Sequence, residues 1–429
     1  MKPERAFARS GFVDPIRVTV VLWLFVLAGA ASADLNPLSP VFLVFVAIGV
    51  GAHLSGMVAC RFRQGRPRRS HAPLYGPSFF VAISATHLNL RRVNRITLCL
   101  LTLQVAGILY FVAAYSDVVL SLDSAGFLAA RNAYLEEVRG LKDKLFIYTT
   151  HLTLFGIGVL FFAARAYGDA ASHGLRASKI PFNLAAVTTL MAALLTTGRT
   201  APLLVILCYS FYCLRFRIFS KSTIVASFGA LSLAMFVVVA FALGKEGLGD
   251  AEQIGVVEAL RSLGRIYFFS APIAMQEVLI KNEVVSNVCS NIFSYPIDLL
   301  KKAGLLSYCE VRELDFVFVP VATNVFTFLR AYWEDFGLAY PIAMFATGYL
   351  IQSVHIRAFQ KPSYFAFIFP FVLNGVLLQI FEEQIFANGS VFAYLTASYM
   401  VCSVVYRPSG ARSPARQASS GPQFTSAAA

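Results

Sequence analysis

The feature that most constrains this chain is a series of long apolar blocks separated by loops rich in arginine. A helix needs about 20 residues to cross the hydrocarbon core of a bilayer. Charged residues make up only 14% of the chain, against about a quarter in soluble domains. We therefore predict an all-α polytopic membrane protein with about ten transmembrane helices. The predicted spans are 16–34, 38–58, 96–114, 146–164, 181–198, 201–216, 222–243, 337–356, 364–381 and 389–406.

The distribution of lysine and arginine predicts the orientation of these spans. With the N-terminus in the cytoplasm and ten crossings, the inner loops hold 23 of the 36 basic residues but only 3 of the 23 acidic ones. The polar, short segment 74–90 is interpreted as interfacial or re-entrant. Counting it as a span would move Arg91, Arg92 and Arg95 to the outer side. Both termini are therefore predicted to be cytoplasmic.

This topology divides the chain into four parts. Residues 1–243 hold spans one to seven, 244–335 form a large outer loop or cap, and 336–406 hold spans eight to ten. Residues 407–429 are rich in Ser, Ala, Pro and Gly, so a disordered cytoplasmic tail is expected. The first apolar block is long and is followed at once by a second, which favours a retained anchor over a cleaved signal peptide.

Several functions and ligands are disfavoured by composition. The net charge of +13 does not indicate nucleic-acid binding, because the basic residues are spread over every inner loop. The seven cysteines lack metal-ligand spacing, and we expect neither a metal nor a cofactor. Cys289 and Cys309 both fall in the outer loop, where oxidation can occur. The sequence leaves their pairing open.

Three arginines on the predicted outer side could bind an anion. Arg199 lies in a very short turn between two spans, where Gly198 permits the tight turn. Its guanidinium can hold phosphate oxygens with two parallel hydrogen bonds, although a snorkelling arginine explains the same position. Arg261 and Arg265 lie four residues apart, on one face of a helix, and precede an aromatic stretch that begins at Tyr267. Contact with anionic lipid is the alternative for this pair.

The stretch 322–337 carries many polar groups immediately before a span. Such groups are costly at a bilayer boundary unless they face water, protein or a ligand. Asn324 and Tyr332 are candidates for orienting a polar substrate, and Asp335 for accepting a proton. Capping of the span that begins at Phe336 is the alternative role for Asp335. His151 is the one histidine placed to reach the outer side.

These motifs resemble the bacterial O-antigen and exopolysaccharide repeat-unit polymerases, the Wzy-type family. The resemblance is carried by the Thr-Gly-Arg turn at 197–199, the long outer loop and the stretch 324–337. It implies a fold related to the C-type glycosyltransferases (GT-C) in the bacterial inner membrane. It also implies undecaprenyl-diphosphate-linked oligosaccharide repeat units as substrates, with a chain-length regulator and a flippase as further partners.

The position and charge of the candidate residues suggest a role for each in such a transfer. Arg199 and Arg265 would hold the donor diphosphate, with Arg261 and Tyr267 assisting. The acceptor sugar would be bound and activated by the three candidates in the stretch 322–337, namely Asn324, Tyr332 and Asp335.

Two other functions remain open from the sequence. An O-antigen ligase would use the same donor but transfer the glycan to lipid A–core. A polysaccharide transporter or flippase would be expected to show internal repeats or broken, charged mid-membrane helices, and neither is visible in the sequence.

Overall fold

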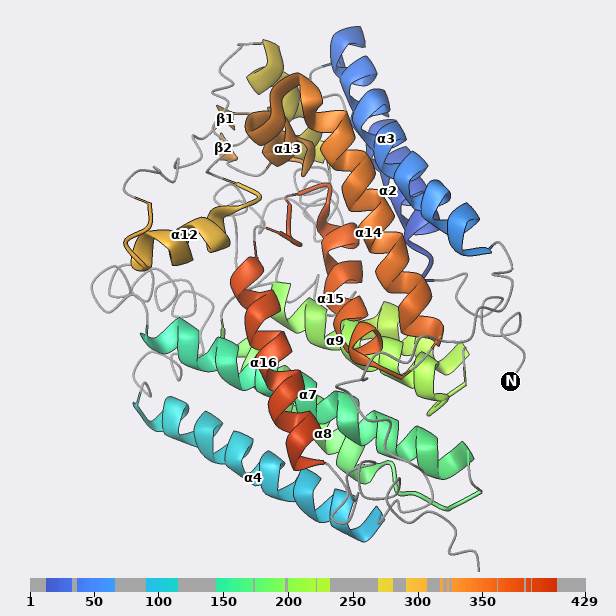
Figure 1. Cartoon of the computed structure of the whole chain (residues 1–429), viewed down its shortest axis with the longest axis vertical. Coiled ribbons are helices and arrows are strands. Elements are labelled where there is room, and N and C mark those ends of the chain that lie inside the picture. The colour runs from blue at the N-terminus through green and yellow to red at the C-terminus, as the bar shows by residue number, and fades with distance from the viewer. Residues whose placement is uncertain are drawn as a thin grey trace, which may run out of the picture.

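The computed structural model describes fifteen stretches of the chain. They are residues 13–32, 37–65, 90–114, 144–172, 174–196, 200–220, 222–231, 269–280, 291–306, 317–318, 322–323, 326–360, 362–381, 383–386 and 388–406. Regular structure within them is helical, apart from one antiparallel pair of two-residue strands (Figure 1).

The longer helices follow the apolar blocks of the sequence. They are α2 (Pro15–Ser32), α3 (Pro40–Gly65), α4 (Leu90–Ala114), α7 (Lys144–Ser172), α8 (Ile180–Leu194), α9 (Thr200–Phe216), α14 (Tyr340–Gln360), α15 (Tyr364–Leu378) and α16 (Gly389–Val405). The shorter elements are the helices Ser222–Leu231 and Phe269–Ile280, α12 (Ser294–Lys302), β1 (Val317–Phe318), β2 (Ala322–Thr323), α13 (Leu329–Phe336) and the 3-10 turn η3 (Gly337–Ala339).

A helix lies at each of the ten predicted spans, with ends that differ by a few residues. For the span predicted at 222–243, the described helix ends at Leu231. Three helices in the described parts are long and apolar enough to cross a membrane, namely Pro40–Gln64, Leu90–Ala113 and Tyr148–Ser172. Most of the others are apolar but shorter. Their number and composition are compatible with a membrane protein. Segment 74–90 and the tail 407–429 lie outside the described residues.

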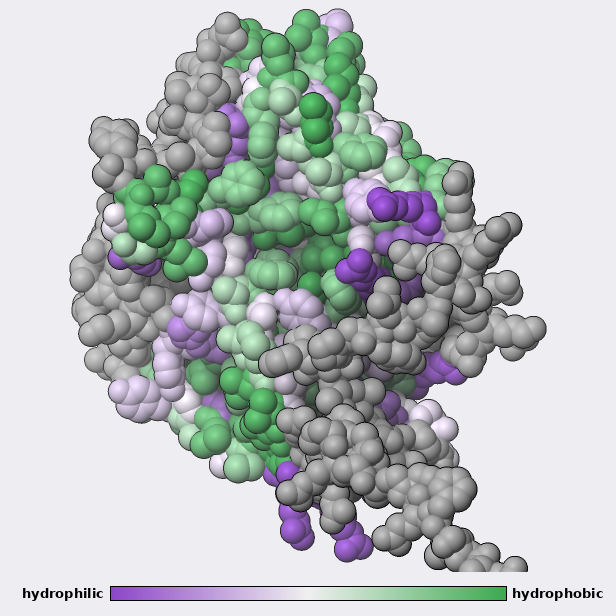
Figure 2. All heavy atoms as spheres, viewed as in Figure 1, coloured by the Kyte–Doolittle hydropathy of each residue, from purple (hydrophilic) through white to green (hydrophobic). Residues whose placement is uncertain are grey.

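Large apolar side chains are exposed along several of these helices. Val41 on α3 is 75% exposed, and Leu103 on α4 and Ile342 on α14 are also more than half exposed. Figure 2 shows a face on which apolar residues predominate and hydrophilic residues form scattered patches. Apolar surface of this extent is unusual for a soluble monomer and suits contact with lipid.

The helices form two groups that α15 joins (Figure 1). In one group, α7 packs against α4, α8, α9 and α16 around a core rich in aromatic rings, which includes Phe161, Tyr212 and Tyr399. In the other group, α3 and α14 lie side by side. A Cβ atom at Gly56 would collide with the carbonyl oxygen of Phe345, and one at Gly348 with that of His53. Glycine is therefore required at both positions for this close helix approach.

Part of the predicted outer loop is built into the helical body. Ala271, Ile273 and Met275 on the helix Phe269–Ile280 are fully buried. The Gln276 side chain holds this helix beside the start of α3, because its Oε1 accepts a hydrogen bond from the Ser39 amide at 2.6 Å. The expectation of a soluble cap at 244–335 therefore omitted an apolar helix that packs inward.

Candidate functional site

The most polar buried region of the described chain surrounds α13. This helix has only eight residues, yet Arg330, Glu334 and Asp335 are all buried within it. Its C-terminus is set by Gly337, whose φ of 53° lies in the left-handed region that favours glycine. The chain turns there through η3 into α14, so the charged helix is attached directly to the end of a long apolar one.

Arg330 and Glu334 form a buried ion pair. They lie at positions i and i+4 on one face of α13, and Arg330 Nε is 2.5 Å from Glu334 Oε1. The guanidinium also lies over the ring of Phe326, 3.8 Å from its centroid, where a cation–π interaction adds to its stability. Arg330 Nη1 is buried and has no hydrogen-bond partner among the described residues. Glu334 Oε2 accepts a further hydrogen bond from Asn291 Nδ2, at 2.9 Å.

Asp335 ties the chain before α12 to the end of α13. Its Oδ2 accepts a hydrogen bond from the backbone N–H of Ile292 at 2.7 Å, and its Oδ1 accepts one from Asn291 Nδ2 at 3.1 Å. Burial raises the pKa of this carboxyl group, and the hydrogen bonds from Ile292 and Asn291 oppose the shift. The helix-cap alternative is wrong, because α14 begins at Tyr340 and Asp335 lies in the last turn of α13.

Tyr332 points away from that ion pair, toward α14. Its hydroxyl lies 2.9 Å from the Thr347 hydroxyl, and either can donate the hydrogen bond. The Tyr332 pKa is raised well above its ordinary value, first by burial and then by the negative charge of Glu383. Tyr332 therefore stays protonated and can serve as a hydrogen-bond donor.

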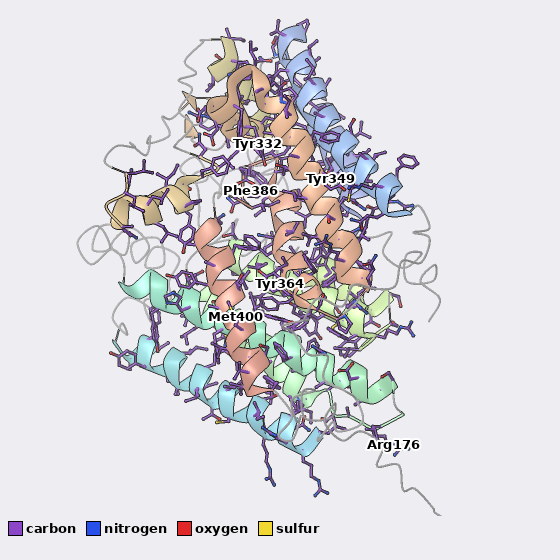
Figure 3. All side chains as sticks on the ribbon, in the orientation of Figure 1. Arg176, Tyr332, Tyr349, Tyr364, Phe386 and Met400 are labelled. Atoms are coloured by element: carbon purple, nitrogen blue, oxygen red, sulfur yellow. The ribbon has the colours of Figure 1, made fainter. Side chains whose placement is uncertain are left out.

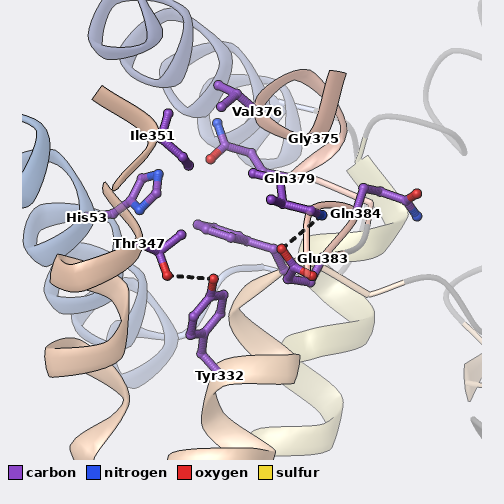
Figure 4. A pocket seen from close by; sticks show the side chains of 11 residues that line it. His53, Tyr332, Thr347, Ile351, Gly375, Val376, Gln379, Glu383 and Gln384 are labelled. Carbon is purple, nitrogen blue, oxygen red and sulfur yellow. Dashed lines mark hydrogen bonds between the residues drawn. The ribbon is translucent and has the colours of Figure 1, made fainter. Parts of the chain in front are cut away.

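Tyr332 and Thr347 border a small cavity with room for about one water-sized group (Figure 4). Its wall comes from α3, α13, α14, α15 and the segment between α15 and α16. The lining residues are His53, Phe328, Tyr332, Thr347, Ile351, Gly375, Val376, Gln379, Glu383, Gln384 and Ile385.

Two side chains from the segment after α15 make this cavity polar. Glu383 is buried, and its carboxylate accepts hydrogen bonds from the backbone N–H groups of Ile385 and Phe386, at 3.0 and 2.9 Å. Gln379 is also buried, and its Oε1 has no hydrogen-bond partner among the described residues. The Gln379 carbonyl accepts the Phe328 N–H at 2.9 Å, which fixes this segment against the start of α13.

The structure brings together only part of the predicted site. Tyr332 and Asp335 lie on α13, where Tyr332 lines the cavity and Asp335 does not. His151 lies on α7 against Tyr394, with 4.3 Å between the ring centroids, and is not among the lining residues. The remaining five predicted residues lie outside the described parts of the chain, namely Arg199, Arg261, Arg265, Tyr267 and Asn324.

Glu383 and Gln379 are the residues that sequence reasoning missed. Glutamine and glutamate recur at 379, 382, 383 and 384, at the end of the ninth predicted span. This is the same pattern of polar groups beside a span that identified the stretch 322–337. It could therefore have indicated a second contribution to the same site.

No group of three or more metal-ligating side chains occurs in the described parts of the chain. No protein-family model, curated protein sequence or solved structure matches the chain. The function must therefore be inferred from the chemistry of this site and from the motifs of the sequence.

Proposed function

We propose that the protein is an inner-membrane polymerase of lipid-linked oligosaccharide repeat units. It would transfer the growing glycan from one undecaprenyl diphosphate carrier to a sugar hydroxyl on another carrier-linked unit. The body would be a bundle of ten transmembrane helices, related in fold to the C-type glycosyltransferases. Both termini would be cytoplasmic, and α12, α13 and the segment 383–388 would lie on the periplasmic side.

The observation that carries the proposal is the buried polar site at one end of the apolar helices. Burial of charged groups such as Glu334 and Asp335 has a large desolvation cost, which proteins tolerate mainly where the groups are paired or functional. In this chain a buried ion pair, a second buried carboxylate and a polar cavity adjoin one another around α13. A membrane-anchored substrate with a polar head is the kind of ligand that such a position suits.

Donor binding and acceptor binding would use two different sets of residues. Arg199 and Arg265, assisted by Arg261 and Tyr267, would hold the donor diphosphate and stabilise the negative charge that develops as it leaves. Asn324 and Tyr332 would orient the acceptor. Asp335 would act as a positioning residue, because its carboxylate holds the chain before α12 and does not line the cavity.

The deciding experiment is polymerisation by the purified protein. Incubation of the full chain in lipid nanodiscs with undecaprenyl-diphosphate-linked repeat unit should yield a ladder of glycans that differ by one repeat unit. A reaction with lipid A–core added distinguishes a ligase, which would form a single lipid A–core adduct. Absence of both products, with transport of the lipid-linked unit across proteoliposomes, would instead identify a flippase.

A further inference from the structure

The cavity beside Tyr332 has a chemical character different from that of the predicted diphosphate site. Its described lining includes one carboxylate and no lysine or arginine. The negative charge of Glu383 would repel a diphosphate. The cavity therefore suits a neutral, polar group.

The polar atoms around the cavity match a sugar hydroxyl. Tyr332 and Thr347 offer hydroxyls, the Gln379 amide offers an acceptor, and Glu383 offers a carboxylate. The cavity has room for about one water-sized group, so it admits a single hydroxyl group of a sugar and not the sugar ring.

The missing hydrogen bond of Gln379 Oε1 is evidence that a ligand binds at this position. A buried polar atom left without a hydrogen bond costs roughly 1–3 kcal/mol, and most buried polar atoms in proteins therefore have a partner. The Gln379 side chain enters the cavity between His53 and Val376 (Figure 4). A hydroxyl that donates to Oε1 would supply the missing hydrogen bond.

We infer that this cavity receives the attacking hydroxyl of the acceptor sugar and that Glu383 takes its proton. The inference rests on the proposed glycosyl transfer. The hydroxyl oxygen forms a bond to the anomeric carbon of the donor, and the bond from that carbon to the diphosphate oxygen breaks. The proton of the hydroxyl passes to Glu383, and the electron pair of the broken bond leaves with undecaprenyl diphosphate.

Glu383 is better placed for this step than Asp335. Glu383 lines the cavity, whereas the Asp335 carboxylate is engaged by Asn291 and Ile292 outside it. The two backbone N–H groups that donate to Glu383 stabilise its ionised form, which is the form that can accept a proton. They also fix its direction, because they come from its own loop at Ile385 and Phe386.

The test compares binding with turnover in the full-length protein in nanodiscs. The binding probe is the free oligosaccharide released by mild acid from the lipid-linked repeat unit. Its binding can be followed by tryptophan fluorescence, because Trp23 packs against Phe328, a residue of the cavity wall, with 6.1 Å between ring centroids. Turnover is scored by the polymer ladder from lipid-linked repeat unit.

Glu383→Gln should bind the oligosaccharide with an affinity within about threefold of the wild type. Its polymerisation rate should fall by at least about 100-fold, the lower end for loss of a general base. Thr347→Val, which removes one hydroxyl at nearly constant volume, should weaken binding about fivefold, as expected for one net hydrogen bond of about 1 kcal/mol.

The matched control is Thr97→Val. Thr97 and Tyr406 form a buried hydroxyl pair with 2.8 Å between oxygens, of the same kind as the Tyr332–Thr347 pair but on α4 and at the end of α16. This variant should leave binding and turnover unchanged. If Glu383→Gln does not fold, Glu383→Asp replaces it, because it keeps the charge but draws the carboxylate back by one methylene group and should also stop turnover.

The inference would be overturned if the Glu383 variant gave a full ladder, or if Thr347→Val bound the oligosaccharide as well as Thr97→Val does. Neither result would contradict the proposed polymerase activity. A wild-type protein that forms no ladder would instead overturn the proposed function.

Discussion

The charged residues of α13 illustrate how a few side chains can dominate a buried site. Arg330 and Glu334 are each less than 10% exposed, and neither charge would be stable there alone. Their i to i+4 spacing was visible in the sequence, but their burial was not. It results from packing of α13 against α3, α14 and the segment before α12, which no local pattern encodes.

Removal of one charge from this pair should destabilise the protein strongly. Glu334→Gln keeps the shape of the side chain but leaves Arg330 as an unpaired buried charge. A loss of about 3–5 kcal/mol in unfolding free energy is expected, measured by urea unfolding in detergent. The control is Asp169→Asn, since Arg165 and Asp169 are also at i and i+4 but lie 3.7 Å apart with Asp169 partly exposed. Its effect should be smaller, because the longer distance and the partial exposure of Asp169 make this ion pair weaker, and equal effects would contradict this expectation.

The Asp335 carboxyl should make stability depend on pH. Its pKa is raised above 3.8 by burial, so the folded state binds a proton more tightly than the unfolded state. Ionisation therefore costs folding free energy, and that cost appears as the pH rises through and above 3.8. Asp335→Asn cannot ionise. Melting temperatures measured from pH 3 to 7 should show the wild type losing stability relative to this variant, and a constant difference would contradict the raised pKa.

The donor arginines can be tested by a substitution that preserves charge. Arg199→Lys keeps a positive charge but loses the planar fork that binds two phosphate oxygens. We expect polymerisation to fall by about 100-fold or more, since removal of one donor to a developing anion costs about 3–4 kcal/mol in known enzymes. Expression and melting temperature should be unchanged. If Arg199→Lys and Arg265→Lys both give a full ladder, the arginines are lipid anchors.

At the scale of elements, the paired helices α3 and α14 position the cavity. His53 and Thr347 lie on them and both line it, and the helices approach closely because Gly56 and Gly348 present no side chain. The distance between the two helix axes therefore fixes the width of the cavity.

Gly348→Ala should separate these helices. The added methyl would meet the His53 carbonyl, so we expect a drop in melting temperature of several degrees and weaker oligosaccharide binding, because Thr347 moves with its neighbour. Gly51→Ala is the control on α3, where nothing lies within 4 Å of the added atom. It should be neutral or stabilising by up to about 1 kcal/mol. Similar losses in both variants would show that the close approach is unimportant.

The elements themselves were largely predictable from the sequence. Each of the ten apolar blocks contains a helix, because a long apolar run with few helix-breaking residues favours helix formation. The helix Phe269–Ile280 was missed because its twelve residues are too few for a span. Glu383 was missed because its role depends on the approach of α13 to the end of α15, through the Phe328–Gln379 hydrogen bond, and such tertiary contacts have no periodic signal.

At the scale of the whole molecule, the polar site and the loop that carries Arg176 lie at opposite ends. Tyr332 lies toward one end of the helical body and Arg176 at the other (Figure 3). Arg176 belongs to a predicted inner loop. This separation agrees with the alternation of the spans and with a site on the outer side.

The orientation can be checked by cysteine labelling of intact cells in a cysteine-free background. Leu305→Cys, in an exposed turn after α12, should react with a membrane-impermeant maleimide, whereas Gln64→Cys, at the exposed end of α3, should react only after lysis. The reverse pattern would invert the topology and remove the argument for a periplasmic active site.

The shortness of α15 has a consequence for how a substrate would reach the cavity. Its 15 residues extend about 22 Å at 1.5 Å per residue, less than the roughly 30 Å of a bilayer's hydrocarbon core. The chain continues as the irregular segment that carries Gln379 and Glu383. In the proposed topology these side chains would lie below the level of the lipid headgroups. A glycan tethered to a long polyprenyl tail could then meet them by lateral diffusion, and the tether length would select which sugar ring arrives.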